Sequence, residues 1–388
     1  MKRSALLKER LYAPGPVEVP PQVLAALARP VEHHRSRVFT ELFHRTRARL
    51  SQLFCVGSDD VLIVTGSGTA GFEAALGTTL APGLRVLALS AGKFGERWAK
   101  LAARLGHDVT QFTAEYGSDF DLAELEGALR STSALDAVTV VHSETSTGVL
   151  HDVQRIAKAV RAAHPDALVI VDAVTSLGAA ELLPLAWDLD VVVSGSQKGV
   201  MTPPGLAFAW LSQRAWARAE AARGGSNYYL DLRRELPMQR KGETAFTPAT
   251  SLVAALDSAL ELLLDGPLPD LWTHRERLNE AVLSAGEALG MTRFARRASP
   301  AVAALSVPEG VAAPKVVDAM LRRGLTIAGG QDSLKPTLIR PSLLGWCDAY
   351  DAVVVAAALE DALLEVAPGA TVKRGAAVAA ALTALDQR

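Results

Sequence analysis

Short apolar runs alternate with stretches of helical periodicity through the first half of this sequence. Strands that alternate with helices favour a mostly parallel sheet with right-handed crossovers, because each crossover helix returns the chain to the same end of the sheet. The pattern therefore predicts an α/β fold. The runs lie at residues 61–65, 85–90, 137–142, 168–174 and 191–193, with a less apolar strand expected at 108–112 and helices at 121–129 and 152–163.

The length of 388 residues and the hydrophobic content of 49% allow a large buried core, and a chain of this size usually divides into two domains. The Gly/Pro cluster Asp265–Asp270 is the best candidate linker. We predict an N-terminal arm over residues 1–20, a large domain over residues 21–265 and a smaller C-terminal α/β domain over residues 266–388. The arm is rich in proline, which favours an extended path.

Acidic and basic residues nearly balance, giving a formal charge of −2. This balance does not suggest binding to nucleic acid or to an anionic membrane, so we expect small-molecule substrates. The two cysteines, Cys55 and Cys347, lie far apart without metal-ligand spacing, so no metal site is expected. So few cysteines, an N-terminus interrupted by charges and the lack of a long uncharged run predict a cytoplasmic location.

Lys198 directly follows the apolar run 191–193, within a cluster of small residues. A residue at this point lies at the carboxyl end of a strand, where open α/β sheets bind their ligands. No charge lies between Val191 and Gln197, and desolvation in such a setting lowers the pKa of an amine and leaves it nucleophilic toward a carbonyl. On position alone, a lysine in a surface turn is the alternative.

Asp172 lies in a second apolar run, at the point where the predicted strand ends. A lysine that forms a Schiff base with pyridoxal phosphate is accompanied by an acid at the pyridine nitrogen, because the protonated ring is the electron sink. Asp172 suits that role, although an isolated aspartate after a strand is also a common helix cap. Lys198 and Asp172 together favour a pyridoxal phosphate enzyme.

A glycine-rich turn, Gly66-Ser-Gly-Thr-Ala-Gly71, joins the first apolar run to a helix. The free N–H groups and the dipole of a helix N-terminus suit a phosphate, and Ser67 and Thr69 add hydroxyl donors. The spacing also matches the dinucleotide fingerprint, but the next run, 85–90, does not end in an acidic residue. We therefore expect the phosphate of pyridoxal phosphate at this turn.

Three motifs in this order resemble those of the class V aminotransferases, and the likeness is greatest to the alanine:glyoxylate and serine:glyoxylate (serine:pyruvate) branch. They are His142–Gly148, Asp172–Gly178 and Ser194–Lys198, within a likeness that runs from Pro14 to Arg340. The resemblance implies the PLP-dependent transferase fold type I, with a large domain whose mostly parallel seven-stranded sheet lies between helices and a smaller C-terminal α/β domain. It also implies a homodimer with a shared active site.

The resemblance also implies roles for particular residues. Phe94 stands where relatives stack an aromatic ring on the cofactor, with Trp98 as its rival one helical turn later. Thr247 would reach the cofactor phosphate from the partner subunit, and Arg340 would bind the substrate carboxylate. Lys198 and Asp172 would be the catalytic residues. The implied cofactor-binding residues are Ser67, Gly68, Thr69, Phe94, Thr147, Asp172, Val174, Gln197, Lys198 and Thr247.

The implied activity is an aminotransferase that moves the amino group of a small L-amino acid, alanine or serine, to a 2-oxo acid such as glyoxylate or pyruvate. A cysteine desulfurase or lyase shares the fold, but a desulfurase usually carries its reactive cysteine ahead of the carboxylate-binding arginine, whereas Cys347 follows Arg340. A third alternative is a non-catalytic scaffold subunit. Such a subunit has no need of Lys198, Asp172 and Arg340 together.

Several segments outside these motifs also carry expectations. Residues 224–243 are polar and contain glycine, so we expect an irregular, mobile flap near the active site. In the small domain we expect strands near 301–307, 325–328 and 338–341, and the tail at 372–388 has helical alternation.

Overall fold

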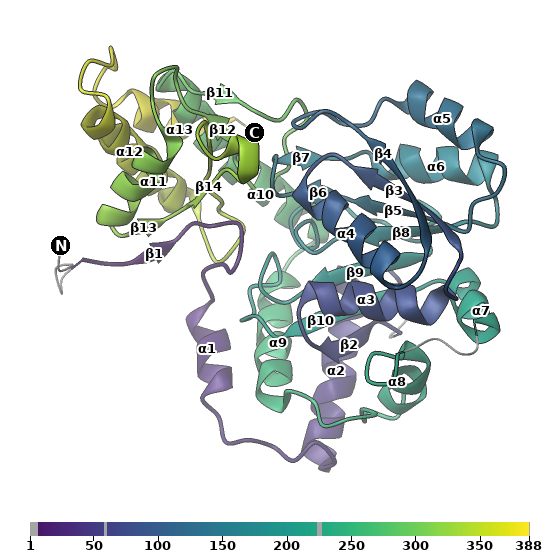
Figure 1. Cartoon of the computed structure of the whole chain (residues 1–388). Helices are drawn as coiled ribbons and strands as arrows, with labels where there is room; N and C mark the ends of the chain where they lie inside the picture. The colour runs from purple at the N-terminus through teal and green to yellow at the C-terminus, as the bar shows by residue number, and fades with distance from the viewer. Residues whose placement is uncertain (1–6, 58–59, 223–226, 388) are drawn as a thin grey trace.

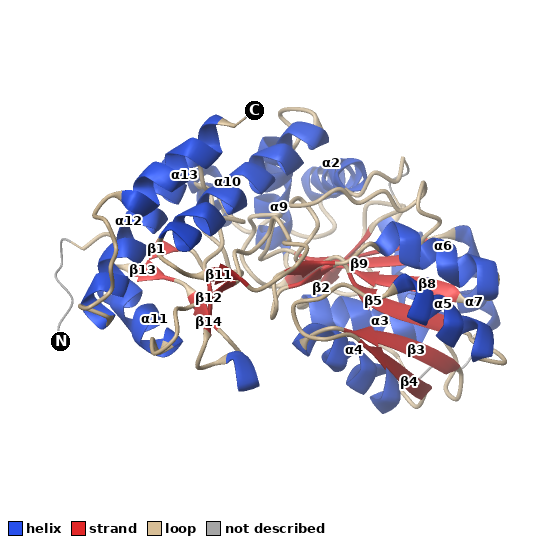
Figure 2. Ribbon diagram, turned by 90° about the horizontal axis from the view of Figure 1, so that it is seen from above, coloured by secondary structure: helices blue, strands red, loops and turns tan. Residues whose placement is uncertain are grey.

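The computed structural model describes residues 7–57, 60–222 and 227–387, and its larger part is built on a seven-stranded sheet with the order β2-β10-β9-β8-β5-β3-β4 (Figures 1 and 2). All neighbouring strands are parallel except β10, which runs antiparallel to β2 and β9. This sheet confirms the predicted fold class. Its strands are β2 (Leu62–Thr65), β3 (Arg85–Ser90), β4 (Asp108–Thr113), β5 (Ala137–Val141), β8 (Leu168–Asp172), β9 (Val191–Gly195) and β10 (Leu206–Leu211).

Helices cover both faces of this sheet, because successive side chains of a strand point to opposite sides. In β8, Val169 and Val171 belong to one hydrophobic cluster, and Leu168 and Ile170 belong to another. Burial of each aliphatic side chain stabilises the fold by about 1.5–3 kcal/mol. The first face is covered by α2 (Arg37–Leu53), α5 (Leu122–Ser131), α6 (Val153–Ala163) and α9 (Thr250–Leu263), and the second by α3 (Gly68–Thr79), α4 (Lys93–Arg104), α7 (Gln213–Ala221) and α8 (Leu232–Gln239).

The C-terminal part of the chain packs around a second, antiparallel sheet with the order β11-β12-β15-β14. Its strands are β11 (Thr292–Arg293), β12 (Leu305–Ser306), β14 (Ala328–Gly329) and β15 (Leu338–Arg340), and its helices are α10 (Leu268–Ala288), α11 (Ala313–Arg322), α12 (Ala349–Val366) and α13 (Ala376–Asp386). Across residues 7–57, 60–222 and 227–387, no helix combines the length and the apolar character needed to cross a bilayer.

The strand expected at 301–307 is shorter than predicted, because only Leu305 and Ser306 pair with β15. Before them, the N–H of Ala303 donates to the carbonyl of Pro341 at 3.0 Å. Proline has no N–H to donate in return, so the ladder between the two segments cannot continue beyond this contact.

The N-terminal arm pairs with the C-terminal part of its own chain. Its strand β1 (Arg10–Leu11) lies parallel to β13 (Leu325–Thr326), and Tyr12 is buried in the cluster around the small sheet. The arm then turns toward α1 (Pro21–Leu27), whose Val23 packs against α9 (Figure 1). Residues 1–6 of the predicted arm lie outside the described residues.

The expectation of an irregular flap at 224–243 is wrong for residues 232–239, which form α8 (Leu232–Gln239). Residues 224–226 lie outside the described residues. The Gln239 side chain accepts from the N–H of Ile63 at 3.0 Å and donates to the carbonyl of Ile63 at 2.7 Å. Because β2 is an edge strand, one side of its backbone has no neighbouring strand, and the Gln239 amide takes that place. The segment is therefore tied to the sheet.

Candidate active site

Lys198 and Asp172 follow adjacent strands of the central sheet. The strand β8 ends at Asp172 and β9 ends at Gly195, and the two strands are parallel, so both side chains lie at the same carboxyl edge. A cavity of about 400 Å³ opens at this edge. Eight of the predicted site residues line it: Ser67, Gly68, Thr69, Phe94, Asp172, Val174, Gln197 and Lys198.

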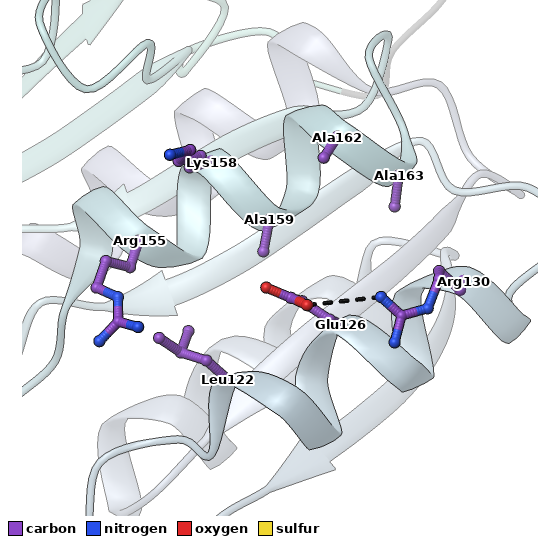
Figure 3. A pocket seen from close by; sticks show the side chains of 8 residues that line it. All are labelled: Leu122, Glu126, Arg130, Arg155, Lys158, Ala159, Ala162 and Ala163. Atoms are coloured by element: carbon purple, nitrogen blue, oxygen red, sulfur yellow. Dashed lines mark hydrogen bonds and ion pairs between the residues drawn. The ribbon is translucent and has the colours of Figure 1, made fainter.

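A second hollow of about 400 Å³ lies on the surface between α5 and α6 (Figure 3). Its floor is formed largely by alanines, and its charged residues include Glu126, which pairs with Arg130 at 3.5 Å. It contains Lys158 and Glu126, but both side chains are exposed and Glu126 is already paired with Arg130, unlike Lys198 and Asp172. The chemistry therefore points to the cavity at the carboxyl ends of the strands.

Asp172 is buried, and its carboxylate is held in place by two N–H groups. The N–H of Val174 donates to Oδ1 at 2.7 Å, and the indole Nε1 of Trp98 donates to Oδ2. Burial raises the pKa of Asp172 to about 6, although both hydrogen bonds lower it. Each carboxylate oxygen has a further lone pair, so Asp172 can accept another hydrogen bond from a cation in the cavity.

Lys198 is half-buried, and its Nζ donates to the carbonyl of Pro14 in the N-terminal arm. Burial lowers the pKa of Lys198 to about 8, with Arg340 and Arg97 acting in the same direction and Asp172 opposing them. The neutral amine is therefore accessible near physiological pH. Gly15 lies against the lysine stem, because a Cβ at this position would lie 2.3 Å from Cδ of Lys198.

The glycine-rich turn contributes the N-terminus of α3 to the cavity. Ser67 occupies the N-cap position, but its hydroxyl makes no capping hydrogen bond and is exposed. The first N–H groups of a helix have no intrahelical acceptor, so this end of α3 offers unpaired donors together with the hydroxyls of Ser67 and Thr69. A Cβ at Gly68 would lie 2.6 Å from Cγ2 of Val174, so only glycine fits there.

The structure separates the roles of Phe94 and Trp98. Trp98 is 2% exposed, stacks on Phe72 with 3.9 Å between ring centroids and donates to Asp172. Phe94 is half-buried in the cavity wall, and the Arg97 guanidinium carbon lies 4.9 Å from the centre of its ring. Phe94 is thus the aromatic ring that remains available for stacking.

Arg340 is buried behind the cavity wall and does not line the cavity. Its Nε and Nη2 donate to the carbonyl of Gly329 at 2.9 and 2.7 Å, and Nη1 donates to the carbonyl of Thr145 at 2.7 Å. A guanidinium has five N–H donors, so these contacts leave one N–H on each terminal nitrogen. These two N–H groups are the donors that Arg340 has left for a carboxylate.

Thr147 and Thr247 also lie outside the cavity wall. Thr147 is buried, with its hydroxyl 3.4 Å from the carbonyl of Glu144, and Thr247 is exposed. Conversely, the cavity is also lined by Gly15, Pro16, Arg97 and Thr175, to which the sequence motifs gave no role in the site. The Pro14-Gly-Pro16 run was a signal for the first two, since it places one position free of a side chain between two prolines, and the chain bends there with a φ of +106° at Gly15.

The residues around the cavity fit pyridoxal phosphate. The open N-terminus of α3 suits the phosphate, Asp172 suits a protonated ring nitrogen, and the Lys198 amine suits the aldehyde carbon. The Oε1 atom of Gln197 is buried without a hydrogen-bond partner among the described residues, so the cavity also holds an unsatisfied acceptor. These features together match a polar, anionic, planar group.

Comparisons with known proteins give consistent results. The family model described as Aminotransferase class-V matches residues 14–347. A protein called soluble hydrogenase 42 kDa subunit, from Anabaena cylindrica, is 40% identical over 96% of this chain and 98% of its own length. A serine–glyoxylate aminotransferase from Methylorubrum extorquens is 32% identical over 98% of this chain and 96% of its own length. A crystal structure of a subgroup IV aspartate aminotransferase from Thermus thermophilus superposes with a TM-score of 0.86 at 40% identity, covering 92% of this chain and all of that one.

Proposed function

Because this chain belongs to the class V aminotransferases, which use pyridoxal phosphate to exchange an amino group between amino acids and 2-oxo acids, we propose that the cavity beside Lys198 is its active site. The observation that carries the proposal is the presence of Lys198 and Asp172 in one cavity at the ends of adjacent strands. The proposed donor is a small L-amino acid, alanine or serine, and the proposed acceptor is glyoxylate or pyruvate.

Each side chain then has a defined task. The bound cofactor supplies the electron sink. Lys198 would hold it through Nζ and would move the proton of the donor Cα. Asp172 keeps the ring nitrogen protonated by its negative charge, and Phe94 stacks on the ring. Ser67, Gly68 and Thr69 would bind the phosphate, and Val174 and Gln197 would complete the surroundings of the ring, whereas Thr147 could support that wall only from behind it.

Arg340 binds the donor carboxylate through its two remaining N–H groups. A carboxylate held at two points fixes the direction of the Cα–H bond relative to Lys198, and such orientation contributes strongly to rate. The contact between Arg340 and the carbonyl of Thr145 places the guanidinium next to a residue of the cavity wall. Arg340 is therefore proposed as the substrate-binding residue.

We extend the proposal to a homodimer in which the two active sites are shared. Thr247 is exposed and does not line the cavity of its own chain, so it would contact the phosphate only from a second copy. We also propose a cytoplasmic location, since the chain has only two cysteines and both are free thiols.

A second class of donor is favoured by one observation. Arg97 lines the cavity, and its guanidinium has no carboxylate partner in the part of the chain that the structure describes. A free cation at this position suits a second carboxylate on the substrate, as in aspartate. The solved structure from Thermus thermophilus carries the name of an aspartate aminotransferase.

Half-reactions followed by visible absorption test both donor classes. The purified protein with bound cofactor should lose its visible band when alanine or serine is added, and the band should return with glyoxylate. An Arg97→Gln variant should respond to alanine as the unmodified protein does, and any bleaching by aspartate should weaken in it. Failure of every amino acid to bleach the band would remove the aminotransferase proposal for this cavity.

The other candidate functions receive less support. Neither cysteine lines the cavity, and burial raises the pKa of Cys347 to about 12, so this thiol is a poor nucleophile for a desulfurase. The Anabaena protein is named as a subunit of a hydrogenase, and such a name agrees with the scaffold alternative. A scaffold does not require a lysine and an acid in one cavity, and a protein that binds no pyridoxal phosphate would support it.

Cofactor capture should depend on pH. Because the pKa of Lys198 is lowered to about 8, the neutral amine increases as pH rises through this value. We expect the rate at which cofactor-free protein captures pyridoxal phosphate to increase with pH, with a midpoint near 8 and a plateau at higher pH, as measured by borohydride trapping and mass spectrometry of the Lys198 peptide. In Asp172→Asn the midpoint should move to lower pH, because the charge of Asp172 raises the pKa of Lys198. A midpoint near the ordinary lysine value of 10.5 would contradict this prediction.

A further inference from the structure

Glu144 is a buried acid to which the mechanism above assigns no task. It is 0% exposed, and no Lys, Arg or His lies within ion-pair distance of it in residues 7–57, 60–222 and 227–387. Its carboxylate is satisfied by four donors instead. Oε2 accepts from the N–H groups of Phe94 and Gly95 at 3.1 Å each, and Oε1 accepts from the N–H and the hydroxyl of Ser146 at 3.1 and 2.5 Å.

One side of this network ends at the ring that is proposed to stack on the cofactor. Phe94 and Gly95 are in the first turn of α4, where N–H groups lack intrahelical acceptors and the helix dipole favours a negative charge. The hydroxyl of Ser146 also accepts from the N–H of Lys93 at 2.9 Å. The start of α4, and with it Phe94, is therefore fixed against the loop that carries Glu144.

The other side of the network ends at the arginine that is proposed to bind the substrate. The carbonyl of Thr145 and the N–H of Ser146 belong to the same peptide group. Its N–H donates to Glu144, and its carbonyl accepts from Nη1 of Arg340 at 2.7 Å. Hydrogen bonds on both sides of one peptide polarise and orient it, so the position of Glu144 is transmitted to Arg340.

We propose that Glu144 is a positioning residue that sets the stacking ring of Phe94 and the carboxylate fork of Arg340 relative to each other. This inference rests on the proposed function of the cavity. Space for Glu144 is provided by Gly92, since a Cβ there would lie 2.5 Å from Cδ of Glu144. The acid neither touches the cavity nor takes part in proton transfer.

Glutamine is the informative replacement, because it keeps the size of the side chain but not its two acceptors. An amide has one acceptor oxygen and one NH₂ group, whereas the four groups that face Glu144 are arranged as two pairs of donors. In Glu144→Gln the side-chain NH₂ group therefore faces one of these two pairs of donors and cannot accept a hydrogen bond from it. We expect the dissociation constant of pyridoxal phosphate to rise about three- to tenfold and the circular dichroism of its visible band to weaken, since stacking geometry changes.

The KM for alanine should rise in the same variant while kcat changes less, because Arg340 loses its alignment but Lys198 does not. Asp121→Asn is the matched control. Asp121 caps α5 through the N–H groups of Ala123 and Glu124 and does not line the cavity, and asparagine caps a helix about as well as aspartate, so this carboxylate-to-amide change should leave the melting temperature, cofactor binding and KM nearly unchanged. If Glu144→Gln does not fold, Ser146→Ala takes its place. This variant removes one donor to Glu144 and should produce the same changes with smaller magnitude.

A double-mutant cycle with Phe94→Ala tests the route of the effect. If Glu144 acts on the cofactor through Phe94, Glu144→Gln adds no further rise in the dissociation constant once the ring is absent. Additive effects would overturn that route. Unchanged cofactor binding, circular dichroism and KM in folded Glu144→Gln would overturn the whole inference, whereas an unmodified protein that binds no cofactor would overturn the proposed function itself.

Discussion

Replacement of Lys198 by alanine should lower the transamination rate by roughly 1,000-fold or more, because the variant loses both the amine that holds the cofactor and the base that moves the Cα proton. Steady-state assays with alanine and glyoxylate measure the rate. Borohydride treatment and mass spectrometry should find no cofactor attached to the variant.

This loss should not result from unfolding. Burial lowers the pKa of Lys198 to about 8, so protonation of the lysine opposes folding at pH below that value. The alanine variant should therefore be at least as heat-stable as the unmodified protein at pH 7. Lys158→Ala is the matched control, since Lys158 is exposed on α6 and should leave activity unchanged. A Lys198→Ala enzyme with more than a few per cent of the normal rate would exclude Lys198 as the catalytic residue.

Replacement of Arg340 by glutamine should lower kcat/KM for the amino acid donor by roughly 100-fold or more. The variant loses two hydrogen bonds between charged groups, each worth about 1.5–3 kcal/mol. The loss should appear both as a higher KM for the amino acid and as a lower kcat. The visible spectrum of the bound cofactor should change little, because Arg340 does not line the cavity beside Lys198.

Arg340→Lys separates charge from geometry. Lysine keeps the positive charge but has no planar fork, so we expect it to recover only a small part of the activity. Because Arg340 also donates to the carbonyls of Gly329 and Thr145, melting temperatures of both variants should be compared. Equal kcat/KM values in the unmodified protein and in folded Arg340→Gln would show that another residue binds the substrate carboxylate.

The order of residues along the chain is enough to predict the central sheet and the pair of residues at its edge. Strands such as β8 are apolar up to their last residue because both faces of the sheet are covered, and this composition is visible without coordinates. Lys198 and Asp172 follow such strands directly, so their place at the carboxyl edge depends on local order along the chain. The glycine-rich turn is equally local, since strand, turn and helix are consecutive.

The distant segments that meet around that pair could be identified only from the packing of the folded chain. Three contacts join residues that are about 50 or more positions apart. They are the hydrogen bonds of the Pro14 carbonyl with Lys198, of the Gln239 amide with the edge strand β2 and of the Glu144 carboxylate with the start of α4. No periodic pattern encodes such contacts, because each depends on where whole helices and loops pack. Helix α8 is a further example. Its polar residues suggested a flap, whereas in the structure one buried amide, that of Gln239, binds the helix to the sheet. Local sequence specifies strands and turns. The partners of isolated polar groups depend instead on which segments pack together in the core, because each buried donor and acceptor needs a hydrogen bond there.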